Sequence, residues 1–122
     1  MSSQASTIVF VYGTLKRGFC RASALADQQF IGEARTVPKY RLVNCGEYPG
    51  LLSTDRGKSI QGELYAVDAK CLHQLDEIEA VEEELYRRGP IELESPYHQT
   101  PVMAYFYNQD TTGMPDCGTS WE

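Results

Sequence analysis

Short runs of β-branched and aromatic residues, separated by glycine, proline and charged positions, recur along the chain. The first run, residues 7–12, is apolar after its initial threonine and is typical of a strand buried on both faces. It stops at Gly13, where a polar turn begins. Residues 46–50 are rich in glycine and proline and predict a loop. The remaining runs predict further strands at residues 30–37, 40–45, 60–67, 86–94 and 102–108.

Two stretches follow a helical pattern instead. Residues 20–28 contain enough alanine and leucine to predict a short helix. Asp68 is placed to cap a second helix, which begins at Ala69 and reaches about Glu79 or a few residues further. Many short strands and two helical stretches predict an α+β fold, in which the strands curl into a small barrel or a strongly bent sheet with few open edges.

The length of 122 residues fits one domain, so we expect a single domain over residues 1–122, with tails at residues 1–6 and about 110–122. Hydrophobic residues make 42% of the chain and charged residues 23%, which is ordinary for a folded domain. No run approaches the roughly 20 apolar residues that cross a bilayer, and no secretory leader pattern follows Met1. We therefore expect a cytoplasmic protein that does not bind a membrane.

Charge and cysteine spacing argue against two further classes of protein. The 11 Lys and Arg residues against 17 Asp and Glu residues give a net charge of −6, which repels phosphate backbones, so nucleic acid is not an expected partner. The four cysteines form no CxxC pair and have no histidine at zinc-ligand spacing, so no metal site is predicted. We expect reduced cysteines that pack in the core, and a Cys/His nucleophilic pair with His73 or His98 stays open.

One carboxylate falls on the apolar face of the predicted second helix. At about 100° per residue, the apolar side chains share a stripe about 120° wide, and Glu79 lies within it. A carboxylate buried against a core is costly unless it has a partner, and functional sites are among the few places where this cost persists. The other members of the stripe are Cys71, Leu72, Leu75 and Ile78.

Two other interpretations of this segment stay open. The helix can fray near residue 78 and leave Glu79 in solvent, and Glu82 would share the stripe if the helix continued. Residues 76–84 hold six carboxylates in nine positions, which is also typical of a solvated acidic surface. In such a crowded segment, desolvation and like charge would raise the pKa of the least solvated member, and that group would exchange protons near neutral pH.

The turn after the first strand has the G-x4-G spacing of a phosphate loop, from Gly13 to Gly18. Phe19 and Cys20 stand where a phosphate loop requires Lys and Ser or Thr, so a nucleotide site is not predicted. The free backbone N–H groups of a glycine turn can bind a smaller anion, such as a carboxylate. This turn could therefore hold a small carboxylated ligand, or be a turn that binds nothing.

Four sequence segments taken together indicate a protein family more specifically than any one of them does. They are Val11-Tyr12-Gly13-Thr14-Leu15-Lys16-Arg17-Gly18, Gly62-Glu63-Leu64-Tyr65-Ala66-Val67-Asp68, Leu75-Asp76-Glu77-Ile78-Glu79 and Tyr86-Arg87-Arg88. This combination closely resembles the γ-glutamylcyclotransferase superfamily, in particular its γ-glutamylamine cyclotransferase and AIG2-like branch. The resemblance implies a small mixed β-barrel of about five to seven strands, flanked by about two helices.

The resemblance also implies a reaction that needs no metal and no cofactor. A γ-glutamyl amine or γ-glutamyl amino acid cyclises to 5-oxoproline when its α-amino nitrogen attacks its γ-carbonyl, and the attached amine is released. We expect the protein to act on this small-molecule substrate as a monomer or a weak homodimer. The family's acid/base glutamate falls on Glu79, and its substrate-binding residues fall on Tyr12, Gly13, Thr14, Leu15, Tyr86 and Tyr105.

The sequence departs from the branch directly after Glu79. Residues 80–84 replace the small or aromatic residue and the proline that members often carry, so the sequence does not choose the leaving amine. The alternative function is a non-catalytic module on the same fold that binds a carboxylated metabolite or a protein partner. Glu79 argues against this alternative, because a binder has no need of a carboxylate beside an anionic ligand.

Overall fold

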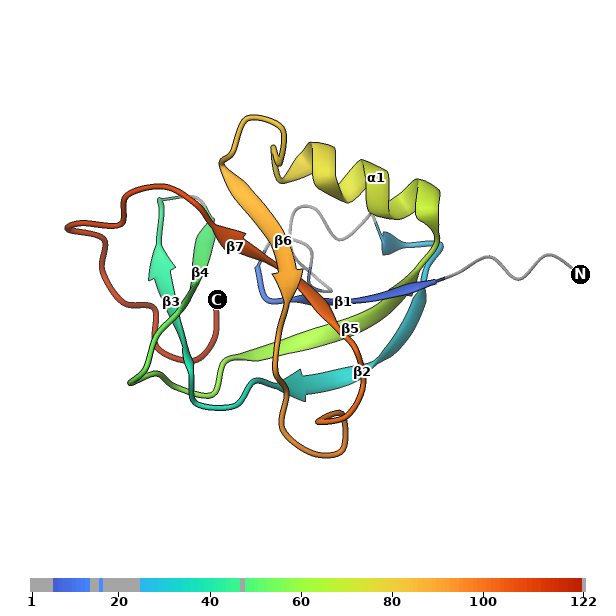
Figure 1. The fold of residues 1–122 in the computed structure, drawn as a ribbon, viewed down its shortest axis with the longest axis horizontal. Helices are drawn as coiled ribbons and strands as arrows, with labels where there is room; N and C mark the ends of the chain where they lie inside the picture. Colours follow the sequence, from blue (N-terminus) through green and yellow to red (C-terminus); the bar gives the residue numbers. More distant parts are fainter. Residues whose placement is uncertain (1–5, 14–15, 17–24, 47, 122) are drawn as a thin grey trace, which may run out of the picture.

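A computed structural model of the chain describes residues 6–13, 16, 25–46 and 48–121, which form seven strands and one α-helix (Figure 1). The helix, α1 (Ala69–Ile78), lies between the fifth and sixth strands in the chain. The α+β class predicted from the sequence is confirmed. The strands are β1 (Thr7–Val11), β2 (Gln29–Arg35), β3 (Tyr40–Asn44), β4 (Pro49–Ser53), β5 (Gln61–Val67), β6 (Tyr86–Pro90) and β7 (Met103–Tyr107).

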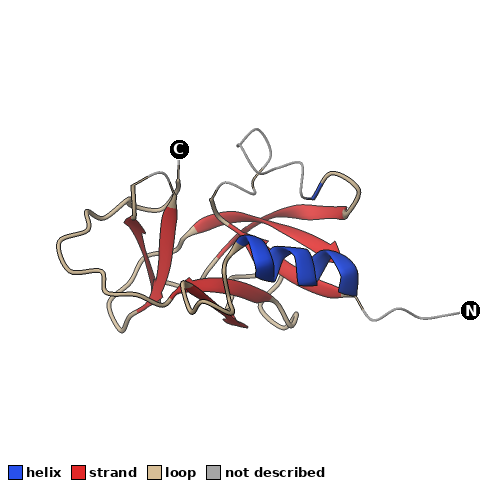
Figure 2. Cartoon of the chain, turned by 90° about the horizontal axis from the view of Figure 1, so that it is seen from above, coloured by secondary structure: helices blue, strands red, loops and turns tan. Residues whose placement is uncertain are grey.

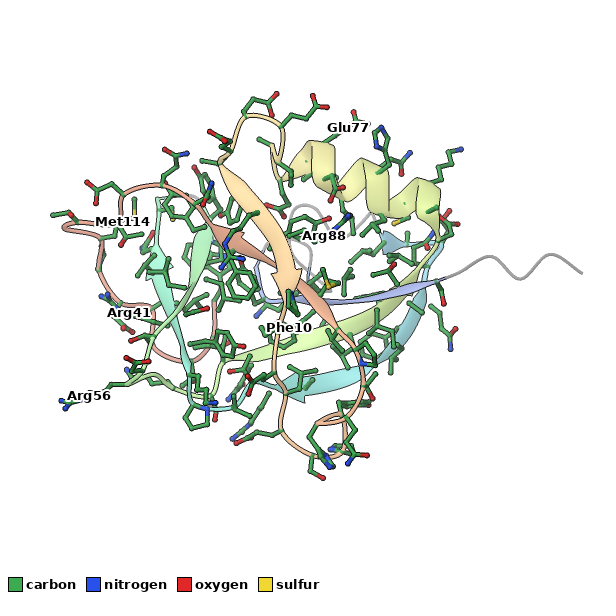
Figure 3. The ribbon with its side chains drawn as sticks, in the orientation of Figure 1. Phe10, Arg41, Arg56, Glu77, Arg88 and Met114 are labelled. Carbon is green, nitrogen blue, oxygen red and sulfur yellow. The ribbon has the colours of Figure 1, made fainter. Side chains whose placement is uncertain are left out.

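β1 is the central strand of a five-stranded sheet with the order β2-β5-β1-β7-β6. It runs antiparallel to β5 and parallel to β7. Successive side chains of a strand point to opposite faces. Phe10 packs in the interior (Figure 3) with Leu42 and Leu64, whereas Val9 packs on the other side with Leu75 of α1. β1 is therefore buried on both faces, as its apolar run predicts.

The closed barrel expected from the sequence is not confirmed. In the part of the chain that the structure describes, β3 and β4 form a separate antiparallel pair, and β2 and β6 are the edges of the larger sheet. At one end of the sheet, the segments at the ends of β2 and β6 contact each other. Thr36 and Leu93 form an isolated β-bridge, and Glu94 N donates a hydrogen bond of 2.8 Å to Arg35 O. The sheet is thus linked at one end of its two edge strands and open elsewhere.

β4 occupies a position where the sequence predicts a loop. Pro49 and Gly50, expected in the loop of residues 46–50, begin this strand and pair with β3. Proline is tolerated as the first residue of a strand because its missing N–H leaves the rest of the ladder intact. A Cβ atom on Gly50 would lie 2.8 Å from Cβ of Tyr107, so glycine is needed for the close approach of β7. The strand therefore depends on a contact between distant segments.

Two other elements of the structure differ from the sequence predictions. β6 ends at Pro90 and not at residue 94, because the chain then leaves the sheet to form the bridge at Leu93. The helix expected at residues 20–28 lies mostly outside the described residues. Its described part is a turn, closed by a bond of 3.0 Å from Gln28 N to Leu25 O.

α1 lies along one face of the sheet (Figure 2). As predicted, Asp68 caps its N-terminus, where Oδ1 of this residue accepts a bond of 2.7 Å from Cys71 N. Cys71 and Leu75 are its buried residues and pack against β1. Within the described ranges, no helix is long and apolar enough to cross a membrane.

The C-terminal end of α1 is closed by main-chain bonds around Glu79, the C-cap residue. Ala80, the next residue, has a positive φ of 51°. Ala80 N donates to Glu77 O at 3.1 Å, and Val81 N donates to Asp76 O at 3.0 Å. This pair of bonds is the Schellman arrangement, which usually has glycine at the positive-φ position. The helix therefore stops at a defined residue and does not fray gradually.

Residues 110–121, which the sequence predicts to be a tail, include a segment packed on the fold. Trp121 packs against the core cluster that contains Phe10. Hydrogen bonds of 2.8 Å hold the segment: Asn44 N to Pro115 O, Cys117 N to Leu42 O, Gln61 N to Thr119 O and Lys16 Nζ to Trp121 O. The C-terminal segment therefore contacts β3, β5 and the turn after β1.

Candidate active site

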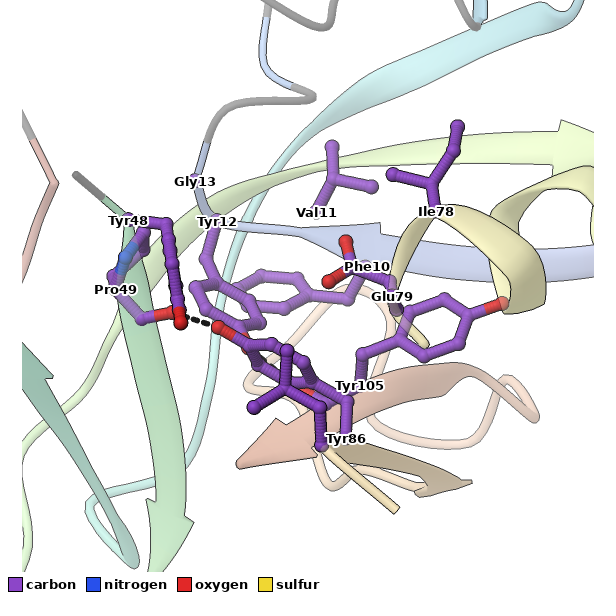
Figure 4. Close-up of a pocket in the computed structure, with 11 residues that line it drawn as sticks. Phe10, Val11, Tyr12, Gly13, Tyr48, Pro49, Ile78, Glu79, Tyr86 and Tyr105 are labelled. Atoms are coloured by element: carbon purple, nitrogen blue, oxygen red, sulfur yellow. Dashed lines mark hydrogen bonds between the residues drawn. The ribbon is translucent and has the colours of Figure 1, made fainter. Parts of the chain in front are cut away.

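A pocket lies where β1 ends, beside the C-terminal end of α1 (Figure 4). Its walls are mostly aromatic and apolar. The lining residues come from β1, the β3–β4 connection, α1, β6 and β7, and they are Phe10, Val11, Tyr12, Gly13, Tyr48, Pro49, Ile78, Glu79, Leu85, Tyr86 and Tyr105. Among the described residues that line it, Glu79 is the one carboxylic acid. Among the described residues, a ligand bound here would contact one acid and several aromatic rings.

The pocket brings together most of the site residues predicted from the sequence. Two of them, Thr14 and Leu15, lie outside the described residues. Five of them line the pocket: Tyr12, Gly13, Glu79, Tyr86 and Tyr105. Their proximity makes a shared role in binding one ligand geometrically possible.

Glu79 directly follows the last turn of α1, and its side chain is half-buried. Its carboxylate lies inside the pocket, with the rings of Tyr12 and Tyr86 nearby (Figure 4). The helix ends at residue 78, as one interpretation of the sequence proposed, but Glu79 lines the pocket and not the outer surface. Glu82, its rival in the sequence, is exposed and does not line this pocket.

Three tyrosines of the pocket donate their hydroxyl protons to protein acceptors. Tyr12 donates to the main-chain oxygen of Tyr105, and Tyr86 donates to that of Pro49, both at 2.5 Å. Tyr105 itself donates to Asp76 Oδ1 at 2.6 Å. A phenol has one proton to donate, so each of these oxygens can only accept a hydrogen bond from a ligand.

These three phenols are neutral in the folded protein. Burial is the main cause, and it raises the pKa of Tyr12, Tyr86 and Tyr105 well above the usual value of about 10. For Tyr86 the charge of Glu79 raises the pKa further, and for Tyr105 the hydrogen bond to Asp76 does so. None of the three phenols is therefore a proton-exchanging group near neutral pH.

Contacts with β4 and with the C-terminal segment hold the turn that follows β1. A Cβ atom on Gly13 would lie 2.7 Å from Cγ of Pro49, so glycine is required here for the approach of β4. Lys16 N donates to Gly13 O at 3.0 Å, and Lys16 Nζ donates to Trp121 O at 2.8 Å. Lys16 is buried, which is rare for a lysine side chain. Its amine is committed to the C-terminal segment.

The comparison with known families gives a direct match. Residues 9–122 match the family described as gamma-glutamyl cyclotransferase, AIG2-like. The chain belongs to this family. The resemblance predicted from the four sequence segments is confirmed.

Relatives of this γ-glutamylcyclotransferase-family chain match along most of its length. A Vibrio cholerae protein, provisionally assigned as a γ-glutamylcyclotransferase, is 45% identical over 111 residues, which cover 91% of this chain and 92% of the relative. The human γ-glutamylaminecyclotransferase is 35% identical over 122 residues, which cover 85% and 79%. The crystal structure of an AIG2-like protein from Mus musculus has a TM-score of 0.83 at 27% identity and covers 96% and 88%. The AIG2-like fold thus accounts for nearly the whole chain.

Some residues of this AIG2-like pocket were missed from the sequence. Tyr48 and Pro49 belong to a predicted loop, and no local signal indicates that they meet β1. Asp76 lies beside the pocket and is not part of its lining; it falls outside the apolar stripe of the predicted helix, yet it is partly buried and accepts bonds from Tyr105 and Arg88. The sequence signal that could have indicated a role for Asp76 is its position in the Leu75–Glu79 segment, three residues before Glu79.

The Cys/His alternative gains no support from the described residues. Cys45, Cys71 and Cys117 are free thiols, and burial raises the pKa of each, which lowers the thiolate fraction needed for nucleophilic attack. His73 Nε2 lies 3.0 Å from Glu77 Oε1 on the exposed side of α1. Within the described ranges, no three His, Cys, Asp or Glu side chains come close enough to hold a metal ion.

Proposed function

We propose that the protein is a cyclotransferase that converts a γ-glutamyl amine or a γ-glutamyl amino acid to 5-oxoproline and releases the free amine. Glu79 is the general acid/base in this proposal. The observation that carries it is one half-buried carboxylate in an aromatic pocket of a γ-glutamylcyclotransferase-family chain. The name of the human relative, γ-glutamylaminecyclotransferase, supports the amine class of substrate.

The reaction asks for few catalytic groups because the nucleophile and the electrophile belong to one molecule. The α-amino nitrogen attacks the γ-carbonyl carbon and forms the C–N bond of the lactam, and Glu79 takes the proton that this nitrogen loses. The bond to the leaving nitrogen then breaks, and Glu79 returns the proton to that nitrogen. Holding the curled conformer contributes strongly, since well-oriented intramolecular reactions reach effective molarities on the order of 10⁵–10⁸ M.

The hydrogen-bonding pattern of the pocket walls suits the amino end of such a substrate. The hydroxyls of Tyr12 and Tyr86 have already donated their protons to the main chain, so the Tyr86 oxygen can accept from an amino N–H, whereas the Tyr12 oxygen also makes a hydrogen bond with the Leu51 main chain. Glu79 and the Tyr86 oxygen therefore offer acceptors to the amino group. We assign the α-carboxylate of the substrate to the N–H groups of the turn that begins at Gly13, which includes Thr14 and Leu15.

A substrate panel tests the proposal. γ-Glutamyl dipeptides and γ-glutamyl amines are incubated with the purified protein, 5-oxoproline is quantified, and the co-product is identified by mass spectrometry. Release of 5-oxoproline with one class of compound would support the proposal and name the leaving group. Absence of 5-oxoproline across the panel, with folding verified by circular dichroism, would contradict it. Calorimetric binding of the same compounds would then favour the non-catalytic module.

A further inference from the structure

Asp76, Arg88 and Tyr105 form a hydrogen-bonded cluster beside the pocket. Asp76 lies in the last turn of α1, and Nη1 of Arg88 contacts both of its carboxylate oxygens, at 3.0 and 2.8 Å. Tyr105 of β7 donates to Asp76 Oδ1 at 2.6 Å. Figure 3 shows Arg88 between β6 and α1. The cluster therefore attaches one turn of the helix to two strands.

This cluster is connected to the pocket on two sides. Asp76 stands three residues before Glu79, so its bonds fix the turn of helix from which Glu79 extends. The main-chain oxygen of Asp76 also accepts from Val81 N, which closes the helix end around Glu79. Tyr105 lines the pocket, and its main-chain oxygen accepts from Tyr12. A shift of Asp76 would therefore displace both Glu79 and the tyrosine wall.

The cluster also sets the charge beside Glu79. Residues three apart on a helix are neighbours, with Cβ atoms about 5–6 Å apart, so Asp76 and Glu79 form a like-charged pair. Arg88 lies on Asp76 and supplies the opposite charge. The Asp76 and Arg88 side chains are 27% and 31% exposed, so solvent screens the pair only in part. Without Arg88, the charge of Asp76 would disfavour a second carboxylate anion nearby.

We infer that Asp76, Arg88 and Tyr105 are positioning residues for Glu79: they hold the end of α1 against β6 and β7, and Arg88 cancels the charge of Asp76. The inference rests on the proposed function, because it concerns the group that carries the chemistry there. Among the residues that the structure describes, several titratable groups surround Glu79, and three of the phenols are neutral, so the Asp76–Arg88 pair contributes charge next to Glu79. These groups are the phenols of Tyr12, Tyr48, Tyr86 and Tyr105 and the Asp76–Arg88 pair.

Three variants separate the charge of Arg88 from its bulk. Arg88→Gln leaves the charge of Asp76 uncompensated, so kcat should fall about tenfold with KM little changed. In a plot of kcat/KM against pH, the fall on the acid side (the acid limb) should move to higher pH by about half a unit. Adding Asp76→Asn to Arg88→Gln removes both charges and keeps an acceptor for Tyr105, so the limb should return to its wild-type position. Arg88→Lys should behave like the wild type, because one nitrogen makes both contacts.

The control is Arg87→Gln, which makes the same charge change at the adjacent residue. Arg87 lies over the Phe106 ring, 4.7 Å from its centroid, so this variant should leave the limb unchanged. All variants are compared below their measured melting temperatures, so that a loss of folding is not mistaken for a loss of positioning. A limb that moves equally in Arg87→Gln and Arg88→Gln would overturn the inference.

A measurement without substrate keeps this test separate from the proposed function. The titration of the Glu79 carboxyl is followed by ¹³C NMR in the wild type, in Arg88→Gln and in the double variant. If the wild type turns over no substrate, the proposed function fails and the NMR shift still decides the inference. An unchanged Glu79 titration in Arg88→Gln, or a double variant no closer to the wild type than Arg88→Gln, would reduce the cluster to a structural salt bridge.

Discussion

The hydroxyl of Tyr86 donates a hydrogen bond of 2.5 Å to the main-chain oxygen of Pro49, and this bond joins β6 to β4, strands of two different sheets. The Tyr86 side chain is buried, and its ring contacts those of Tyr48 and Tyr107. Tyr86 therefore holds the β3–β4 pair against the larger sheet as well as lining the pocket.

Tyr86→Phe keeps the ring and leaves the Pro49 carbonyl without this donor. A buried acceptor that loses its partner costs about 1–3 kcal/mol, so the free energy of unfolding should fall by that amount in urea denaturation. Tyr97→Phe, at a half-buried phenol outside the pocket, is the matched control and should change it by less than about 0.5 kcal/mol. Equal stability of Tyr86→Phe and the wild type would show that the bond contributes nothing.

Glu79→Gln preserves the size of the side chain and removes the base. We expect the rate of 5-oxoproline formation to fall by roughly 10²–10⁴-fold, the range typical of general acid/base catalysis, with the melting temperature retained. Glu82→Gln removes an exposed carboxylate three residues away and should leave the rate nearly unchanged. Near-normal turnover in Glu79→Gln would remove this residue from the mechanism.

Alkaline pH should destabilise the fold through the buried phenols. Burial raises the pKa of Tyr12, Tyr86 and Tyr105 above the value of about 10 in an unfolded chain. Below about pH 10 both states keep these protons and the full stability is present. Above that pH the unfolded chain releases protons that the folded protein retains, so stability falls by about 1.4 kcal/mol per pH unit for each phenol.

Urea denaturation between about pH 8 and pH 11 measures this slope, and Tyr12→Phe should make it shallower by the share of one phenol. An identical slope in the variant would mean that Tyr12 ionises as freely in the folded protein as in the unfolded chain. Because these phenols stay neutral while the protein is folded, an alkaline limb of activity should not move in this variant.

Ala80→Gly should stabilise the protein. A residue with a Cβ atom costs about 1 kcal/mol at a positive φ such as the 51° of Ala80, and glycine adopts this conformation freely. The extra freedom of glycine in the unfolded chain offsets part of the gain, so a net increase of about 0.5 kcal/mol is expected in thermal unfolding. Ala69→Gly, at the start of the same helix, should instead destabilise it. A loss of stability in both variants would contradict the Schellman interpretation.

Local interactions explain what the sequence could predict. The cap of α1 joins Asp68 to Cys71, three residues away, and the central strand is one apolar run, so both follow from a short window of sequence. Periodicity also placed Glu79 on the buried side of its helix. β4 was missed because Gly50 is a strand residue only where Tyr107 fills the space beside it.

The burial of Asp76 also depends on contacts that are distant in the sequence. A helical wheel counts only the residues of the helix itself, and on that basis Asp76 belongs to the polar side. Its actual partners, Tyr105 and Arg88, come from two strands that follow it in the chain. The end of the helix near Glu79 agrees with the prediction, although alanine at residue 80 does not signal a positive φ as glycine would.

β1 and β7, the first and the last of the seven strands, are neighbours in the sheet. The hydroxyl of Tyr12 consequently finds its acceptor on Tyr105, 93 residues later in the chain. During synthesis this wall of the pocket cannot be assembled until β7 has left the ribosome, and contacts so distant in sequence form slowly. A nascent fragment that stops before β7 would contain Glu79 and Tyr86 but would lack the strand that completes their pocket.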